Sequence, residues 1–160
     1  MTDELGFEPP QNQPNSPQRI LVVEGVCELR QLNTELLIEA GYQVDVAEDG
    51  AAAWAKLLLS KYDLLITDQF LPKMSGVELL KKIHVARMTM AFIMTTEKLP
   101  TLEFALHPCL QNVSMLRKPY TIENFLGMVK SVLVNTTSFA SIGIARLNCQ
   151  RQSEVNAAAY

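Results

Sequence analysis

The feature that most constrains this chain is a fivefold alternation of short apolar runs with amphipathic segments. The runs lie at 20–23, 44–47, 64–66, 91–94 and 113–116, with Asp45 and Ser114 interrupting the second and the fifth. After each run, apolar residues recur at helical spacing, as in the stretch that begins at Leu29. Short apolar runs are typical of strands buried on both faces. Helices between such strands favour parallel pairing.

Local signals mark where several of these helices begin and end. Gly41 should end the first helix, Asp49-Gly50 should lead into the second, and Thr121 should cap the last. Prolines flank 101–106, so the fourth helix should be short. Right-handed crossovers would place helices on both faces of the sheet. The predicted fold is α/β: a flavodoxin-like, doubly wound, three-layer α/β/α sandwich with parallel strands in the order 2-1-3-4-5.

The two ends of the chain differ from this core in composition. Residues 1–18 are polar and proline-rich, so we expect a disordered tail that buries too little apolar surface to fold. Residues 19–135 form the predicted domain. Residues 136–160 are rich in Ser, Asn, Gln and Ala, and we interpret them as a C-terminal extension that is too short for a second domain.

Charge and composition exclude several classes of function. The formal net charge of −3 gives no basic surface for nucleic acid. No apolar stretch is long enough to span a bilayer, and the polar N-terminus does not resemble a secretory signal. The three cysteines are few and widely spaced, which disfavours a disulfide scaffold or a zinc site. We expect a cytoplasmic protein with reduced thiols, Cys27 and Cys109 being buried.

Polar side chains with useful chemistry follow the predicted strands. Glu24 follows the first strand, Asp68 ends the third, Thr95-Thr96 ends the fourth, and Lys118 follows the fifth. Because the carboxyl ends of parallel strands meet at one edge, these groups should converge there. Carboxylates suit Mg²⁺, and an ammonium and a hydroxyl suit the oxygens of a phosphoryl group.

At this point a resemblance becomes specific. The segments that carry it are Ile20–Glu24, Asp63–Asp68 with Leu71-Pro72 and Gly76, Ile93–Thr96, and Lys118-Pro119. Together they resemble the receiver domain of bacterial two-component response regulators, in a stand-alone, chemotaxis-regulator-like form. The similarity covers roughly 19–135.

The resemblance implies a role for each matching residue. Asp68 would accept a phosphoryl group from a histidine kinase or a phosphotransfer protein, forming an acyl phosphate. Lys118 would pair with the carboxylate and then with the phosphoryl group, and Thr96 would be the hydroxyl that moves toward it. Glu24, Asp68 and the backbone carbonyl of Phe70 would hold Mg²⁺. The output would be contact with a downstream protein, and the resemblance leaves a homodimer open.

Four positions depart from the family pattern. Gly25 stands where the family has a second acid, so we expect weak Mg²⁺ binding. Glu97 follows Thr96 where a small residue is usual, and Met115 replaces an aromatic side chain. The short fourth helix should make the family's output face unusual.

Two alternatives stay open on the sequence. A pseudo-receiver that works without phosphorylation is favoured by Gly25. An enzyme on a related fold is disfavoured, because a haloacid dehalogenase-type phosphatase needs a second acid where Phe70 stands. A flavodoxin needs a phosphate-binding loop rich in small and hydroxyl residues, which Glu24–Glu28 does not provide. We therefore expect a signalling protein rather than an enzyme.

Overall fold

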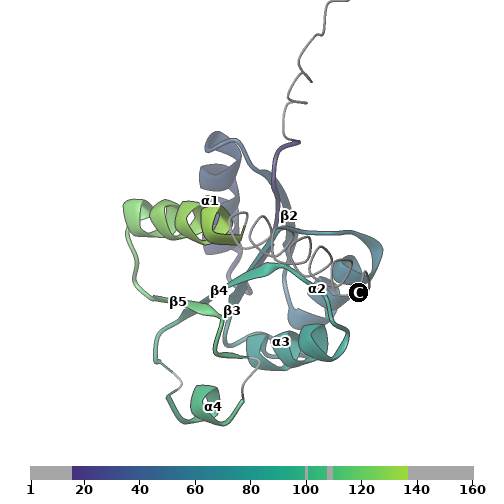
Figure 1. Ribbon diagram of the computed structural model, residues 1–160. Helices are drawn as coiled ribbons and strands as arrows, with labels where there is room; N and C mark the ends of the chain where they lie inside the picture. Colours follow the sequence, from purple (N-terminus) through teal and green to yellow (C-terminus); the bar gives the residue numbers. More distant parts are fainter. Residues whose placement is uncertain (1–15, 100, 108–109, 137–160) are drawn as a thin grey trace, which may run out of the picture.

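The computed structural model describes residues 16–99, 101–107 and 110–136, which build one five-stranded parallel sheet (Figure 1). The strands are β1 (Arg19–Val23), β2 (Gln43–Ala47), β3 (Leu64–Asp68), β4 (Ala91–Thr96) and β5 (Ser114–Arg117). Their order is β2-β1-β3-β4-β5, as predicted, and every neighbouring pair is parallel. Most of the predicted polar tail and nearly all of the C-terminal extension lie outside the described residues.

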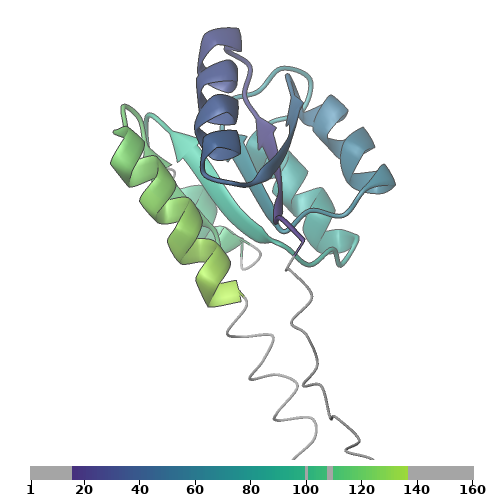
Figure 2. The same cartoon turned by 90° about the horizontal axis from the view of Figure 1, so that it is seen from above.

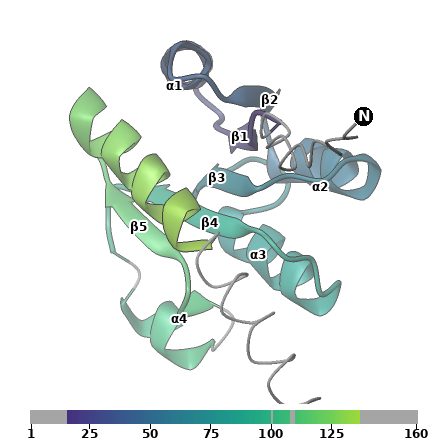
Figure 3. The same cartoon turned by 45° about the horizontal axis from the view of Figure 1, so that its top comes forward.

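Helices cover both faces of this sheet. They are α1 (Cys27–Glu39), α2 (Gly50–Leu59), α3 (Gly76–Val85), α4 (Thr101–Leu106) and a final helix over 122–136. The final helix lies beside α1 on one face, and α2 and α3 cover the other (Figure 2). The predicted three-layer, doubly wound sandwich is therefore confirmed. The fourth helix is short, as expected, and lies near the β5 edge (Figure 3).

The helix ends follow the predicted local chemistry. Gly41 has φ +94°, and the Tyr42 N–H behind it donates to the Leu37 carbonyl at 3.1 Å, which ends α1. The Asp49 carboxylate accepts from the Ala52 N–H at 2.7 Å and caps α2. Thr121 caps the final helix in the same way, accepting from Asn124 N–H at 3.1 Å.

The strands divide their buried side chains between two hydrophobic cores. Ile66 and Ile93 face α1 and the final helix, where Phe125 is fully buried. Leu65 and Met94 face α2 and α3. Because successive strand residues point to opposite faces, this alternation also decides which side chains at the strand ends reach the same site.

One sequence expectation about the surface is wrong. Cys27 is exposed, not buried, because it is the first residue of α1 and lies beyond both cores. Cys109 lies outside the described residues. Within the described ranges, none of the helices is long and apolar enough to cross a membrane.

Both ends of the described chain lie at the amino edge of the sheet, far from the carboxyl ends of the strands. Figure 2 shows the two ends on the same side of the sheet. Gln18, Asn135 and Thr136 line the same hollow there. Nearby, Asp45 of β2 accepts hydrogen bonds from the Tyr62 hydroxyl at 2.7 Å and from Arg19 at 2.8 Å. The Arg19 guanidinium also lies 5.0 Å from the centre of the Tyr62 ring.

This cluster shifts the pKa of two of its members. The hydrogen bond from Tyr62 lowers the pKa of Asp45 below 3.8, against the opposing effect of burial, and Arg19 lowers it further. Burial and the hydrogen bond to Asp45 raise the pKa of Tyr62 to about 12, so Tyr62 stays a neutral donor at pH 7.

The lowered pKa of Asp45 predicts a pH-dependent stability effect. Ionised Asp45 stabilises the fold above its unfolded-state pKa, near 3.8, and the effect disappears as the pH falls through the lower folded-state pKa. Because 35% of the side chain is exposed, Asp45→Asn should cost only about 0.5–1 kcal/mol at pH 7. Urea unfolding between pH 7 and pH 3 checks this. A gap between variant and wild type that stays constant over this range would contradict it.

The start of α3 packs against the end of β3 so closely that only glycine fits at position 76. A Cβ on Gly76 would lie 2.2 Å from the Asp68 carbonyl oxygen. Gly76→Ala should therefore destabilise the fold by about 1–3 kcal/mol. The matched control is Gly127→Ala in the final helix, where a Cβ meets nothing within 4 Å, and it should be neutral or stabilising. Thermal unfolding of both variants tests this, and equal melting temperatures would refute the packing argument.

Candidate functional site

Three charged side chains meet at the carboxyl edge of the sheet. Asp68 is the last residue of β3, Glu24 follows β1, and Lys118 follows β5. The Lys118 Nζ lies 3.0 Å from Asp68 Oδ2 and 3.1 Å from Glu24 Oε2. Strands β1 and β3 are neighbours, so the two acids lie side by side, and the long lysine side chain reaches them across β4. The structure thus brings together three of the predicted site residues.

The electrostatics of this group are those of two acids that share one cation. The side chains of Glu24, Asp68 and Lys118 are only 3%, 13% and 16% exposed. Burial by itself lowers the pKa of Lys118, but hydrogen bonds to Asp68 and Glu24, together with their charges, outweigh it and raise the pKa above its ordinary value. Lys118 therefore stays protonated at neutral pH, as a contact for an anionic oxygen must.

The two carboxylates are not equally engaged. Glu24 Oε1 accepts from the Val26 N–H at 3.1 Å while Oε2 faces Lys118, so both of its oxygens are occupied. The Glu24 backbone carbonyl also accepts from Arg30 of α1 at 2.7 Å. Asp68 Oδ1 has only a long contact, 3.4 Å, from the Phe70 N–H. Asp68 is thus the acid with an oxygen available for a new partner.

The structure does not bring Thr96 to this group. Thr95, not Thr96, is the register partner of Asp68, so Thr95 and Asp68 point to the same face of the sheet. Thr96 points to the opposite face, where its hydroxyl contacts Gln69 and the Lys98 carbonyl. Within the described part of the chain, the Thr95 hydroxyl has no hydrogen-bond partner. Thr95, rather than Thr96, therefore shares a face of the sheet with Asp68.

The choice of Thr95 follows from the register of the two strands rather than from the sequence alone. Ile66 of β3 and Ile93 of β4 are register partners. Asp68 lies two residues after Ile66, and Thr95 lies two residues after Ile93. Counting by two along both strands from these paired isoleucines selects Thr95. The pair of consecutive threonines obscures this choice when only the strand end is considered.

The oxygen atoms at this edge form a partial set of ligands for Mg²⁺. Glu24 and Asp68 contribute carboxylates, and the Phe70 carbonyl belongs to the loop that directly follows Asp68. Mg²⁺ takes oxygen ligands and keeps several waters, so the residues fit the ion. In the described ranges, no group of three Asp, Glu, His or Cys side chains could hold a metal. Backbone and water oxygens would therefore have to complete the coordination.

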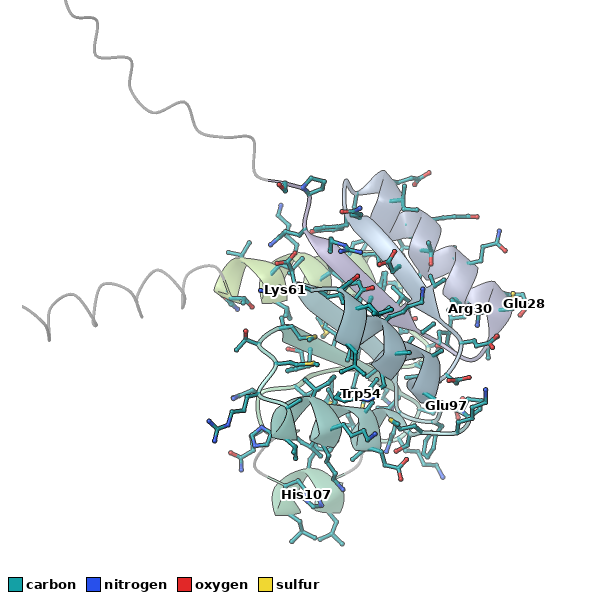
Figure 4. The ribbon with its side chains drawn as sticks, turned by 90° about the vertical axis from the view of Figure 1, so that its right-hand side faces the viewer. Glu28, Arg30, Trp54, Lys61, Glu97 and His107 are labelled. Carbon is teal, nitrogen blue, oxygen red and sulfur yellow. The ribbon has the colours of Figure 1, made fainter. Side chains whose placement is uncertain are left out.

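Two of the positions that depart from the family pattern, Gly25 and Glu97, border the site: Gly25 leaves space beside it, and Glu97 adds an exposed carboxylate at its rim. A Cβ on Gly25 would lie 3.6 Å from Pro72 Cδ and 3.8 Å from the Glu48 carbonyl oxygen, both ordinary contacts, so a larger residue fits. Glu97 is exposed and lines a hollow with Lys118 at the rim of the site. Figure 4 shows Glu97 on the same side of the molecule as Glu28 and Arg30, opposite Lys61.

Comparison with known proteins places this geometry in a family. Residues 20–130 match the family described as the response regulator receiver domain. The transcriptional regulatory protein DltR of Streptococcus agalactiae is 31% identical over 112 residues, which cover 70% of this chain and 50% of that protein. The transcriptional regulatory protein CpxR of Klebsiella pneumoniae is 34% identical over 115 residues, covering 72% and 49%. The chain thus spans about half the length of these relatives.

Solved structures agree with the sequence match. The chemotaxis response regulator CheY4 of Vibrio cholerae superimposes with a TM-score of 0.67 at 26% identity, covering 73% of this chain and 99% of CheY4. A CheY-like receiver domain protein of Methanospirillum hungatei gives a TM-score of 0.70 at 28% identity, covering 77% and 98%. The matched residues run through all five strands and include the acidic edge, which is the carboxyl end of the sheet with Glu24, Asp68 and Lys118. The chain therefore belongs to the response regulator receiver domains of two-component signalling.

Proposed function

We propose that this receiver accepts a phosphoryl group on Asp68 from a histidine kinase or a phosphotransfer protein and signals by protein–protein contact. The observation that carries the proposal is the ion pair of Asp68 with Lys118, at 3.0 Å, beside Glu24 at the carboxyl edge. Phosphorylation-dependent signalling is the general function of the family. The acceptor residue and the donor class are proposals for this chain.

The proposed reaction transfers a phosphoryl group between a nitrogen and an oxygen. The Asp68 oxygen that Lys118 does not hold attacks phosphorus, and the bond from phosphorus to the donor's histidine nitrogen breaks. The nitrogen keeps the electron pair, and an acyl phosphate forms on Asp68. Lys118, already charged and within reach, then pairs with a phosphoryl oxygen. Because it lies on the same face, the Thr95 hydroxyl supplies a donor to the same group.

Mg²⁺ would be held by Glu24, Asp68 and the Phe70 carbonyl. When bound, it would supply positive charge that offsets the repulsion between the carboxylates and the incoming phosphoryl oxygens. We propose that binding is weak, because Gly25 provides no carboxylate and both Glu24 oxygens already have partners. These hydrogen bonds take one acceptor position on each Glu24 oxygen and leave fewer for the ion.

A phosphorylation-independent pseudo-receiver is the second candidate. The observation that favours it is that Lys118 already neutralises part of the charge of both acids, at a site that lacks a third carboxylate. In that case the acidic edge would be a structural ion pair, and the surface alone would bind partners.

The setting of the proposed function follows from the family and from the charge. We propose a cytoplasmic signalling module, not an enzyme, with a downstream protein as its target and no nucleic-acid or membrane partner, given the net charge of −3. Association as a homodimer is compatible with this proposal. The names of DltR and CpxR describe transcriptional regulators, but their output is not carried over, because the chain spans only half of their length.

The acceptor assignment predicts the loss of labelling in one variant. Wild-type protein with Mg²⁺ and radiolabelled acetyl phosphate should take up label in an acid-stable, base-labile form, and Asp68→Asn should reduce it to background. Asp63→Asn, an exposed acid at the other end of β3, is the matched control and should label normally. Label that persists in Asp68→Asn refutes the assignment. Wild-type protein that stays unlabelled even in high Mg²⁺ favours the pseudo-receiver.

The metal assignment predicts a gain from one added carboxylate. Gly25→Asp should tighten Mg²⁺ binding by roughly tenfold or more, since a third carboxylate would lie beside Glu24 and Asp68 and the space permits it. Gly25→Asn has nearly the same shape without the charge and should leave the affinity near that of wild type. Isothermal titration of both variants measures the difference. Equal affinities for Gly25→Asp and Gly25→Asn would rule out an ion at this edge.

A further inference from the structure

The strongest feature outside the acidic edge is the polar contact that Thr96 makes on the other face of the sheet. Thr96 is fully buried, and its hydroxyl touches the Gln69 side-chain amide and donates to the Lys98 carbonyl at 2.6 Å. The same oxygen accepts from the Lys98 N–H at 3.2 Å. Residues 97–99, which follow β4 and lead to α4, are exposed. The Thr96 hydroxyl contacts this segment through the backbone of Lys98.

Gln69 connects this contact to the acceptor. It directly follows Asp68, and its side chain is largely buried, with 8% of the residue exposed. Its backbone N–H donates to the Thr95 carbonyl at 3.0 Å, and its carbonyl accepts from the Gly76 N–H at 3.0 Å. Gln69 thus joins the ends of β3 and β4 to the start of α3. Its side-chain amide contacts the Thr96 hydroxyl, which in turn contacts the Lys98 backbone.

The Thr96 hydroxyl has one proton and two acceptors within reach, the Lys98 carbonyl and Gln69 Oε1. It donates to one of them at a time, or the Gln69 amide is turned so that its NH₂ donates to the hydroxyl oxygen. In either arrangement the buried hydroxyl links Gln69 to the Lys98 backbone. A buried polar contact of this kind favours one arrangement of the backbone around it.

We propose that Gln69 and Thr96 are positioning residues that hold 97–99 in the unphosphorylated arrangement. This proposal rests on the proposed function. Thr95 and Thr96 are adjacent but face opposite sides, so a backbone movement that brings Thr95 toward a phosphoryl group on Asp68 also displaces Thr96. That movement separates Thr96 from Gln69 and Lys98. The network therefore opposes activation, and its strength sets the balance between the two states of the segment.

The test is an NMR comparison of the full chain and three variants. In wild-type protein, Mg²⁺ and beryllofluoride, a phosphoryl analogue, should shift the backbone amide signals of 97–99. In Thr96→Val without ligand, these signals should move along the same line toward the bound positions, because the activated population rises about fivefold for each hydrogen bond of about 1 kcal/mol that the hydroxyl loses. Thr96→Ser keeps the hydroxyl and should stay at the wild-type positions. The double variant Gln69→Met/Thr96→Val removes both polar partners and replaces Thr96→Val if that variant does not fold.

The outcomes separate this inference from the proposed function. Signals of free Thr96→Val that coincide with wild type, or that move off the line to the bound positions, overturn the proposal, as does a Thr96→Ser variant that behaves like Thr96→Val. If beryllofluoride leaves wild-type signals unchanged, the proposed function fails. In that case, the effect of Thr96 on the backbone of 97–99 is measured by amide hydrogen exchange. Faster exchange at these residues in Thr96→Val supports the positioning role of Thr96, and unchanged exchange refutes it.

Discussion

The acidic edge depends on the Lys118 ammonium, which lies between two nearly buried carboxylates. Without this cation, Glu24 and Asp68 would face each other as like charges, with little solvent to screen them. The lysine can fill this place only because the strand order puts β5 two positions from β3 and lets a long side chain cross β4. The same cation is the one that an anionic ligand on Asp68 would meet. The stability of the resting site and its capacity to accept a charged group therefore come from one side chain.

Strand alternation is the second constraint, and it divides the carboxyl edge into two sides. Glu24, Asp68, Thr95 and Lys118 follow the residues that pack under α1 and the final helix. Thr96 follows the opposite core, next to α3. Gly76 lets the start of α3 pack directly against the Asp68 carbonyl on this second side. Asp68, the proposed acceptor, is consequently held both by the packing of its backbone against α3 and by the charge of Lys118.

Most of the fold and the charged part of the site are predictable from the sequence. The buried runs identify the strands, and the ends of three of them supply Glu24, Asp68 and Lys118, whose meeting follows from parallel pairing. The choice between Thr95 and Thr96 is different, since it depends on the register of β4 against β3, and two identical residues in a row give no local clue. The contact between Gln69 and Thr96 is also not predictable from the sequence, because it depends on how the side chains after β3 and β4 are placed. Cys27 was expected inside because free cysteines are often buried, but its position at the start of α1 exposes it.

The placement of the chain ends has a practical consequence for handling the protein. Gln18 and Thr136 border the same hollow at the amino edge, a full strand length from Asp68. A fluorophore, an affinity label or a surface tether attached at Gln18 or Thr136 would therefore lie at the end of the sheet opposite Glu24, Asp68 and Lys118. Protein immobilised through either residue would keep these three side chains away from the surface.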